Sequence, residues 1–393
     1  MTAAPPFDAL LVDPRAHADG RVDAVFQQLR AELPVSRCEP PDFPAFWSVV
    51  CYDDVRSVYA DPTAFGSTGG VLLRPSALGG DPGGGLTLAL SDPPRHGALR
   101  GLLTPLFDER HARSLHDTMR RDVRSVLRRA ADQGEVDLAH EIGQRLSSLQ
   151  IARLLGVPEV DLEQVCCWIG ESFAAGRPMT SHQALASYVI DMIYDRMERP
   201  LFDVIGRLVD GEPEGEPLSE TEILLNVENI LGASENAGLS LAAGFLGLLE
   251  HPSELSRLRE DPRWVQPACE EVLRWASSAS HSMRTARHDT VLSGVPIRKG
   301  DLVVVWVRSA NRDDTVFESP RSFKIDRSPN RHLALGTGEH VCIGQSVARH
   351  QMRVVLESLR TEVASIEATG EVRWIESIAV SGPAELPVRI RMR

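Results

Sequence analysis

The segment with the clearest potential for chemistry in this 393-residue chain is residues 331–349, which read RHLALGTGEHVCIGQSVAR. Gly336, Gly338 and Gly344 surround a single cysteine, Cys342, and a helical pattern begins just beyond it. At a helix N-terminus, unpaired N–H groups and the positive end of the dipole favour thiolate over thiol. The glycines would let the backbone approach a large flat ligand closely. Taken alone, the segment is equally compatible with a glycine-rich turn carrying an incidental cysteine.

Residues 335–344, LGTGEHVCIG, resemble the haem loop F-G-x-G-x-H-x-C-x-G of the cytochrome P-450 family, the haem-thiolate monooxygenases. The match departs only at Leu335, where phenylalanine is usual. The resemblance implies that the cofactor is haem b, that Cys342 is the axial ligand of its iron, and that Gly336 and Gly344 contact the cofactor. Thiolate ligation of haem iron favours O–O cleavage, so the implied activity is oxidation by activated dioxygen.

A second motif of the same family lies upstream of the cysteine. Glu271-Val272-Leu273-Arg274 matches its E-x-x-R helix, and the segment containing Arg327 looks like the one that supplies a second arginine. By itself, a Glu and an Arg three residues apart on a helix usually form a surface ion pair. The resemblance instead implies a buried Glu271–Arg274–Arg327 network that holds the haem loop.

The resemblance also implies which residues bind the haem carboxylates. Asp92-Pro93-Pro94-Arg95-His96-Gly97-Ala98-Leu99-Arg100 is similar to the family's D-P-P-x-H-x-x-x-R, with His96 and Arg100 four residues apart on one helical face. Arg284 matches a further propionate-binding arginine, and His340 matches the propionate-facing histidine of the haem loop. Two carboxylates and four donor or cationic groups make a sensible charge balance in a partly buried site.

The expected oxygen-activating groove departs from the family pattern A-G-x-[DE]-[TS]. The matching residues are Gly232, Ala233, Ser234, Glu235 and Asn236, so an amide stands where an alcohol is usual. The small residues leave room for dioxygen, and Glu235 retains the acidic position. An amide donates and accepts hydrogen bonds, but it does not relay protons near neutral pH.

Two interpretations of Asn236 remain open at this point. In one, Asn236 still positions a water molecule and a substrate is hydroxylated in the conventional way. In the other, the substrate supplies the missing hydroxyl or amine, or the reaction is aromatic C–C or C–O coupling or another substrate-radical oxidation. A peroxide-driven enzyme is a further alternative, and retention of Glu235 weakens it. A haem-based ligand sensor without turnover is the alternative that is not an enzyme.

The substrate pocket is expected above the haem, with walls that are mostly small or apolar. The residues assigned to it by resemblance are Val71, Leu72, Phe173, Gly232, His281 and Ser282. The expected substrate is a small organic molecule, and the expected class includes aromatic and carrier-bound molecules. The expected pathway is bacterial natural-product biosynthesis of the antibiotic type.

Electrons must come from a partner, because the chain carries no flavin or nicotinamide fingerprint. A ferredoxin or flavodoxin is therefore expected. Arg110, Arg113, Arg349 and Arg353 lie on segments expected near the cysteine side and would form a basic patch that attracts an acidic partner. Ordinary solvated helix faces are the alternative interpretation of these arginines.

The elements that must position these residues are mostly helices. Most of residues 105–275 carry helical spacing, and a capping box at Ser219 and Glu222 begins a long apolar helix that runs to Pro252. Strand signals are fewer, at 47–50, at 302–307 and in a last pair near Trp374 and 388–390. The predicted fold is mainly α with small peripheral β-sheets, a single domain over residues 1–393. In the family this fold forms a triangular prism around a buried haem.

Composition limits the function classes. The chain has 42 Lys and Arg against 55 Asp and Glu, a formal net charge of -13, which argues against nucleic-acid binding. No apolar run approaches a membrane span, and the first residues lack the basic and apolar regions of a signal peptide. The expected location is the cytoplasm. Six scattered cysteines form no C-x-x-C pair, and no G-x-S-x-G elbow of a hydrolase is present.

Overall fold

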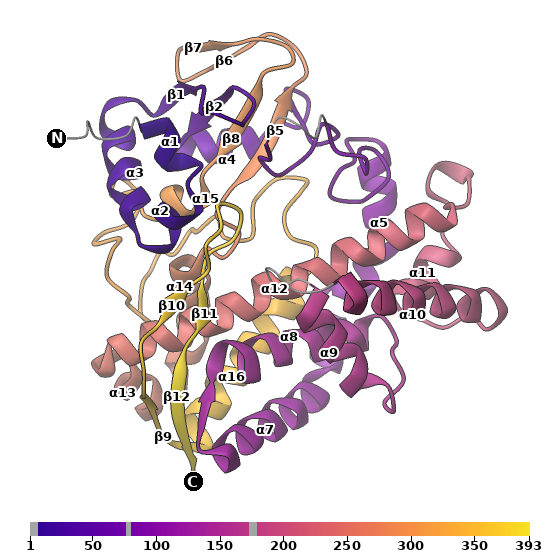
Figure 1. The fold of residues 1–393 in the computed structure, drawn as a ribbon, viewed down its shortest axis with the longest axis vertical. Helices are drawn as coiled ribbons and strands as arrows, with labels where there is room; N and C mark the ends of the chain where they lie inside the picture. Colours follow the sequence, from indigo (N-terminus) through magenta and orange to yellow (C-terminus); the bar gives the residue numbers. More distant parts are fainter. Residues whose placement is uncertain (1–6, 76–79, 173–178) are drawn as a thin grey trace.

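The structure of the protein is a computed structural model that describes residues 7–75, 80–172 and 179–393. Long helices form most of it, and small sheets lie at its edges (Figure 1). The N-terminal helices pack beside the largest sheet, and the C-terminal strands lie near the lower edge in the same view. The fold is therefore mainly α with small β-sheets, as the sequence predicts.

Helix α12 (Glu220–Glu250) crosses the middle of the molecule (Figure 1). Ser219 caps it: its hydroxyl accepts the Glu222 N–H, and the Glu222 carboxylate in turn accepts the Ser219 N–H. This reciprocal pair satisfies donors that a helix start leaves unpaired. Most of the second half of α12 is buried, because helices pack against it on several sides.

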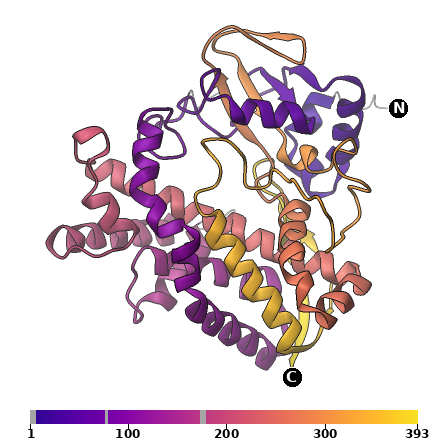
Figure 2. The same cartoon turned by 180° about the vertical axis from the view of Figure 1, so that it is seen from behind.

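Helices that surround α12 carry the expected motifs. Figure 2 shows α16 (Gln345–Thr361) and α5 (Arg95–Phe107) on the face opposite to the view of Figure 1. Helix α14 (Val265–Ala276) packs against both α12 and α16. The remaining helices and helical turns are α1 (Phe7–Leu11), α2 (Pro14–Ala18), α3 (Arg21–Glu32), α4 (Tyr52–Ala60), α6 (Glu109–Ser114), α7 (His116–Gln133), η2 (Ala139–Gln144), α8 (Arg145–Leu154), α9 (Leu162–Ser172), α10 (Met179–Glu198), α11 (Val204–Val209), η3 (Pro213–Gly215), α13 (Pro252–Glu260), η4 (Pro262–Trp264) and α15 (Val307–Ala310).

The largest sheet has the strand order β1-β2-β8-β5-β3. Its central strand β8 pairs parallel with β2 and antiparallel with β5, and three of its four residues are buried valines, as suits a strand covered on both faces. A three-stranded sheet has the order β4-β12-β9, and β6-β7 and β10-β11 are two-stranded. The strands are β1 (Val35–Cys38), β2 (Phe46–Val49), β3 (Phe65–Gly66), β4 (Glu135–Asp137), β5 (Ser282–Ala286), β6 (Thr290–Leu292), β7 (Val295–Ile297), β8 (Leu302–Val305), β9 (Val363–Ala368), β10 (Arg373–Trp374), β11 (Pro383–Glu385) and β12 (Pro387–Met392).

Two strand predictions need correction. The predicted strand 302–307 ends at Val305, because the Trp306 side chain is drawn into a buried contact with Phe26 and donates to the Ser48 hydroxyl at 3.0 Å. Helix α15 then begins at Val307. The strands near Trp374 and 388–390 do not form one pair, since β10 pairs with β11 while β12 pairs with β9 and β4.

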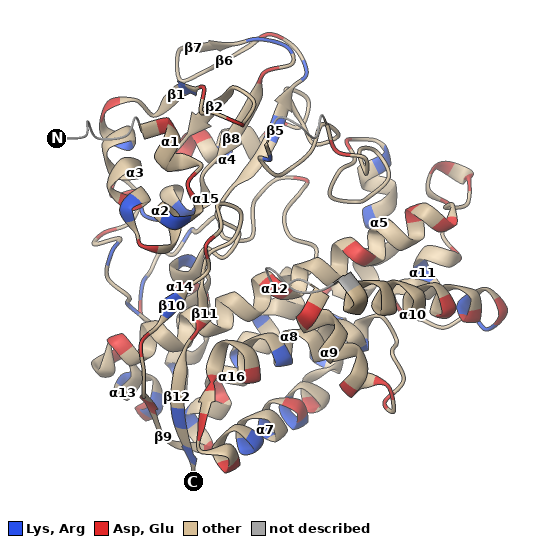
Figure 3. Ribbon diagram, viewed as in Figure 1, with Lys and Arg blue, Asp and Glu red and all other residues tan. Residues whose placement is uncertain are grey.

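Charged side chains are spread over the helices, with basic and acidic residues interleaved along α7 (Figure 3). Across the described ranges, no helix combines the length and apolar character needed to span a bilayer.

Candidate active site

The loop before α16 presents Cys342 to a cavity of about 430 Å³. Gly336 and Gly338 have φ values of 68° and 73°, in the left-handed region that favours glycine. A side chain at Gly338 would also meet the Tyr59 carbonyl oxygen, only 2.5 Å from the position of its Cβ. The Cys342 N–H donates to the Leu335 carbonyl at 2.8 Å, which closes the loop.

Two opposing effects act on the Cys342 thiol. Burial raises its pKa, whereas the Gly344 N–H and the charges of Arg100 and Arg349 lower it. Gly344 is the N-cap of α16, so Cys342 lies at the start of a helix. The N–H group at the helix end thus favours thiolate, as expected, but burial has the larger effect on the pKa. Coordination to a metal ion would hold the thiolate, because a coordinating thiol is deprotonated.

Four cationic or donor side chains meet at one side of this cavity. His96 and Arg100 come from α5, Arg284 comes from β5, and His340 comes from the cysteine loop. The rings of His96 and His340 lie 4.0 Å apart between centroids. In the described part of the chain, neither arginine has a carboxylate within 4.0 Å.

Electrostatics at this cluster indicates an unmatched positive charge. Burial lowers the pKa of Arg284, and burial together with the neighbouring charges lowers the pKa of His340 to about 3. Arg284 is positioned by neutral groups, donating to the Ser282 hydroxyl at 2.7 Å and stacking over the Tyr59 ring at 5.3 Å. A buried cation without an anion is costly, so this cluster is suited to bind carboxylates.

On α12, Ala233 and Asn236 line the cavity, whereas Gly232 and Glu235 are not among its described lining residues. Among the described residues, the buried Asn236 side-chain oxygen finds no hydrogen-bond partner. The Asn236 backbone carbonyl accepts the Ser240 hydroxyl at 2.8 Å. Burial raises the pKa of the Glu235 carboxyl.

The expected substrate wall is present in part. Val71, Leu72, His281 and Ser282 line the cavity, and Phe173 lies outside the described residues. Both ring nitrogens of His281 are engaged by backbone: Nε2 accepts the Leu73 N–H at 3.0 Å and Nδ1 lies 2.9 Å from the Ile378 carbonyl. Burial lowers the pKa of His281 to about 4. The neutral ring therefore ties two loops together and has no nitrogen left for a substrate carboxylate.

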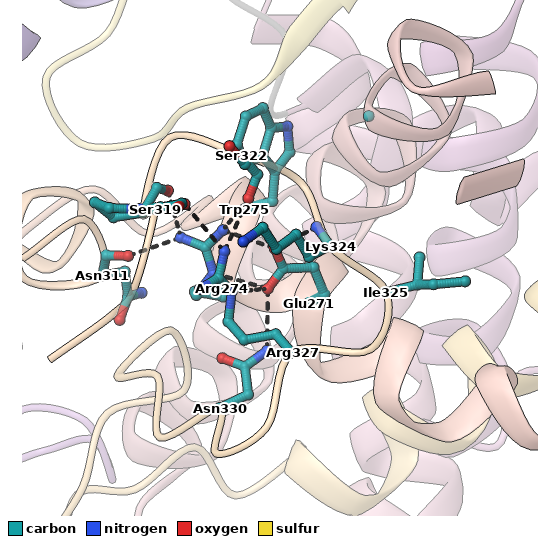
Figure 4. Close-up of polar contacts among 12 residues, drawn as sticks. Glu271, Arg274, Trp275, Asn311, Ser319, Ser322, Lys324, Ile325, Arg327 and Asn330 are labelled. Atoms are coloured by element: carbon teal, nitrogen blue, oxygen red, sulfur yellow. Dashed lines mark hydrogen bonds and ion pairs between the residues drawn. The ribbon is translucent and has the colours of Figure 1, made fainter. Parts of the chain in front are cut away.

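Behind the cysteine loop, the fully buried Glu271 lies at the centre of a network of polar contacts (Figure 4). Its carboxylate accepts Arg274 at 2.7 and 2.8 Å, and Arg327 at 3.0 Å. The Lys324 N–H and the Asn330 amide donate to the same carboxylate at 2.9 and 3.1 Å. The two guanidinium groups donate in addition to carbonyl oxygens of the described segment 311–322. The network thus pins the chain that leads into the cysteine loop to α14.

Several residues of the site carry no motif. Asn226 of α12 accepts the Leu88 N–H at 2.8 Å and donates to the Leu86 carbonyl at 3.0 Å, fastening the loop over the cavity. Its signal in the sequence is weak, because other polar residues, such as Glu228 and Asn229, lie close to it on the same helix. Phe107 of α5 lines the cavity and lies 4.0 Å from where a Cβ on Gly344 would be. An aromatic ring therefore reaches the neighbourhood of the thiol although position 335 is leucine, and no local pattern predicts this.

The donor set fits haem b. It offers one thiol at the end of a cavity lined mostly by apolar side chains and, at one side, cations without anions for two carboxylates. The groups that would hold the haem come from α5, β5 and the cysteine loop, far apart in sequence. Such an arrangement binds one large planar ligand with a carboxylate-bearing edge.

Comparisons with known proteins agree with this geometry. The family model "Cytochrome P450" matches residues 182–360. The chain is 32% identical to cytochrome P450 NovI of Streptomyces niveus, over 97% of this chain and 96% of that protein. It is also 32% identical to the mycinamicin IV hydroxylase/epoxidase of Micromonospora griseorubida, over 96% and 98% of the two chains.

Among solved structures, P450 OxyD, which is involved in the biosynthesis of vancomycin-type antibiotics, superposes with a TM-score of 0.90 at 31% identity. The match covers 97% of this chain and 99% of OxyD. Cysteine loop, carboxylate-binding cluster and relatives all agree: the chain belongs to the cytochrome P450 family, and is a haem-thiolate monooxygenase whose cofactor is haem b.

Proposed function

We propose that this protein hydroxylates a small organic molecule in bacterial natural-product biosynthesis, with Cys342 as the thiolate ligand of the haem iron. The observation that carries the proposal is the cavity of about 430 Å³ in which Cys342 and the four-residue carboxylate-binding cluster meet. Relatives that take part in antibiotic biosynthesis support the pathway. The substrate's identity does not follow from the mostly apolar walls.

Haem b, when bound, supplies the activation of dioxygen, and the thiolate ligand favours O–O cleavage. The residues of the chain bind and orient the cofactor. His96, Arg100, Arg284 and His340 would bind the propionates, and Cys342 would ligate the iron. The Glu271 network acts at a distance by holding the cysteine loop in place.

On α12, Ala233 leaves space and Asn236 presents an amide to the cavity. Since an amide does not relay protons near neutral pH, we propose that the substrate brings the hydroxyl or amine that donates the proton. The support for this is the Asn236 oxygen, which has no partner among the described residues and is therefore available to a donor from outside the chain. A water molecule ordered by Asn236 is the competing arrangement.

Electrons would come from a separate protein, and a ferredoxin or flavodoxin is the proposed donor. The proposed basic docking patch contains Arg110, Arg113, Arg349 and Arg353. It is partly neutralised, because Glu109 lies 3.9 Å from Arg113 and 3.6 Å from Arg353. Arg349 pairs with Glu270 at 3.0 Å.

The deciding experiment is the carbon monoxide difference spectrum of the reduced, purified protein. We expect a thiolate-type Soret band that Cys342→Ala loses. Cys269→Ala, which removes another buried thiol near α16, should keep the band. Purification without haem, or a Cys342→Ala variant that retains the band, would overturn the assignment. A reductase system and product analysis then separate the enzyme from a ligand sensor.

A further inference from the structure

A second cavity, of about 450 Å³, lies outside the haem site. Helices α3 and α15 border it on one side, and α14, β10 and the end of α12 border it on the other. These elements meet in the left half of Figure 1. Its described lining residues are all different from those of the haem cavity. The two cavities are therefore separate, and this one takes no part in the proposed function.

Positive charge dominates the lining of the second cavity. Four arginines contribute to it, and its described acidic residues are Asp23 and Glu250. The arginines are Arg30, Arg308, Arg312 and Arg321. This excess contrasts with the net negative charge of the whole chain.

Only one of these arginines has an ion pair in the described part of the chain. Arg308, which is 6% exposed, pairs with Asp23 at 2.9 Å and donates to the His17 carbonyl at 3.1 Å. Its Nε has no hydrogen-bond partner among the described residues. Donor capacity therefore remains even at the arginine that is paired.

Arg312 lies within reach of the charge of Asp23 but forms no ion pair with it. It donates to the Trp275 carbonyl at 3.0 Å and lies 3.4 Å from the Arg308 carbonyl, and no described carboxylate is within 4.0 Å. Burial and the neighbouring charge of Arg308 lower the pKa of Arg312 to about 9. A guanidinium in this situation gains from any anion that reaches it.

Within the described ranges, the hydrogen bonds of the other two arginines also go to neutral partners. Arg30 donates to the Ser309 hydroxyl at 2.7 Å, and the exposed Arg321 donates to the Gln27 amide oxygen at 2.6 Å. Asp313 and Asp314 act on Arg30 through their charge without pairing with it. Arg321 and Gln27 are thus placed to meet a ligand that enters from solvent.

Aromatic surface completes the cavity. Trp275 and Trp374 line it, and the Arg312 guanidinium lies 5.6 Å from the centroid of the Trp275 ring. Arginine binds planar carboxylates and phosphates through paired N–H donors, and indole rings pack on flat apolar groups. We propose that this cavity binds a small organic oxyanion, a carboxylate or a phosphate monoester with a flat apolar body, through Arg312, Arg321 and Arg30.

The test is isothermal titration calorimetry of the haem-loaded protein with phenyl phosphate, benzoate and uncharged benzyl alcohol. Saturating 4-phenylimidazole keeps the probes out of the haem cavity. We expect one saturable site for at least one anion and none for benzyl alcohol. Tighter binding of phenyl phosphate assigns a phosphate ligand, and tighter binding of benzoate assigns a carboxylate. The proposal is overturned if neither anion saturates below about 10 mM, or if benzyl alcohol binds equally well.

Variants identify the site. Arg312→Gln and Arg321→Gln should each weaken binding at least about tenfold, as loss of a charged hydrogen bond does. Arg321 is exposed, so its variant tests the site even if Arg312→Gln fails to fold. Arg128→Gln makes the same charge change at an exposed position of α7 and should bind within about twofold of the parent protein. Equal affinities in all three variants would overturn the site.

Discussion

At the scale of single residues, the haem cavity contains an unpaired amide oxygen and an arginine without a counter-ion. In the described part of the chain, the Asn236 oxygen has no hydrogen-bond partner, and Arg284, which is 5% exposed, has no ion pair. Buried polar groups in native proteins are almost always bonded, so an unpaired one calls for a partner from outside the chain, a ligand or a water molecule. We propose the cofactor as the partner of Arg284 and the substrate as the partner of Asn236.

The variant Asn236→Thr tests the proposed role of the substrate. If the substrate supplies the proton donor, a threonine hydroxyl adds nothing to proton delivery. The yield of product per electron should then stay within about twofold, while loss of the amide contact weakens ligand binding about tenfold. Ligands are found by their low- to high-spin shift, and product is compared with electron donor consumed. The control is Asn229→Thr, which makes the same substitution at another asparagine of the cavity wall. Better coupling to an unchanged product would favour the ordered-water mechanism instead.

Glu235 makes stability depend on pH. Burial raises the pKa of its carboxyl above 4.5, so its contribution is fully favourable below the unfolded pKa and is lost as the pH rises through the folded pKa. Glu235→Gln should therefore be more stable than the parent protein at about pH 7.5 and equally stable near pH 4. The gain at about pH 7.5 should be about 1.4 kcal/mol for each unit by which the folded pKa exceeds the unfolded pKa. Chemical unfolding at both pH values measures this difference. Glu250→Gln makes the same change at an exposed position of the same helix and is the control.

At the scale of elements, the sequence predicted what local signals specify. The capping box at Ser219 and the following apolar run predicted α12 to within two residues at its end, because a cap and a long helical pattern act locally. The turn after β8 was missed, because the burial of Trp306 depends on α3, far away in the sequence. Phe107 and Asn226 were missed for the same reason. Their roles arise where two distant segments meet.

Glu271→Gln tests the element that holds the cysteine loop. Removing the carboxylate leaves Arg274 and Arg327 buried without compensation, which should lower the free energy of unfolding by about 3–5 kcal/mol and reduce haem occupancy. The control is Glu357→Gln on α16. Glu357 pairs with Arg360 at 2.6 Å with the same E-x-x-R spacing, but its side chain is 44% exposed. That change should cost at most about 1 kcal/mol. Equal losses in both variants, measured by urea unfolding and the Soret-to-protein absorbance ratio, would contradict a special role of the buried network.

Asn226→Ala tests the connection between α12 and the loop at 86–88. The substitution leaves the Leu88 N–H and Leu86 carbonyl without their side-chain partner, so this loop should open more often. We expect ligand dissociation from the haem cavity to accelerate about tenfold, measured by stopped-flow spectroscopy of the spin shift. Asn229→Ala removes a second asparagine from the same wall and should leave dissociation within about twofold of the parent rate. Similar rates in the two variants would argue that the loop is held by other contacts.

At the scale of the whole molecule, the net charge opposes the proposed docking of an acidic electron donor. A net charge of -13 repels an acidic electron donor at long range, so docking depends on local basic groups. Glu109 and Glu270 already neutralise part of the proposed patch. Of its members, Arg110 and Arg113 are exposed, and they lie at the start of the chain segment that packs on α16. These two are the residues on which electron transfer should depend most.

The double variant Arg110→Glu and Arg113→Glu should slow reduction of the haem by an acidic ferredoxin about tenfold at low ionic strength, because steering by complementary charge is lost. Screening shortens the reach of surface charges, so the difference should shrink at about 0.5 M salt. The control is Arg298→Glu with Lys299→Glu, which makes the same charge change after β7, at the opposite end of the molecule from α7 (Figure 1). Stopped-flow reduction under carbon monoxide measures both rates. If both double variants slow reduction equally, the net charge governs the encounter and the patch has no special part in it; if only the first does, the partner docks on the cysteine side.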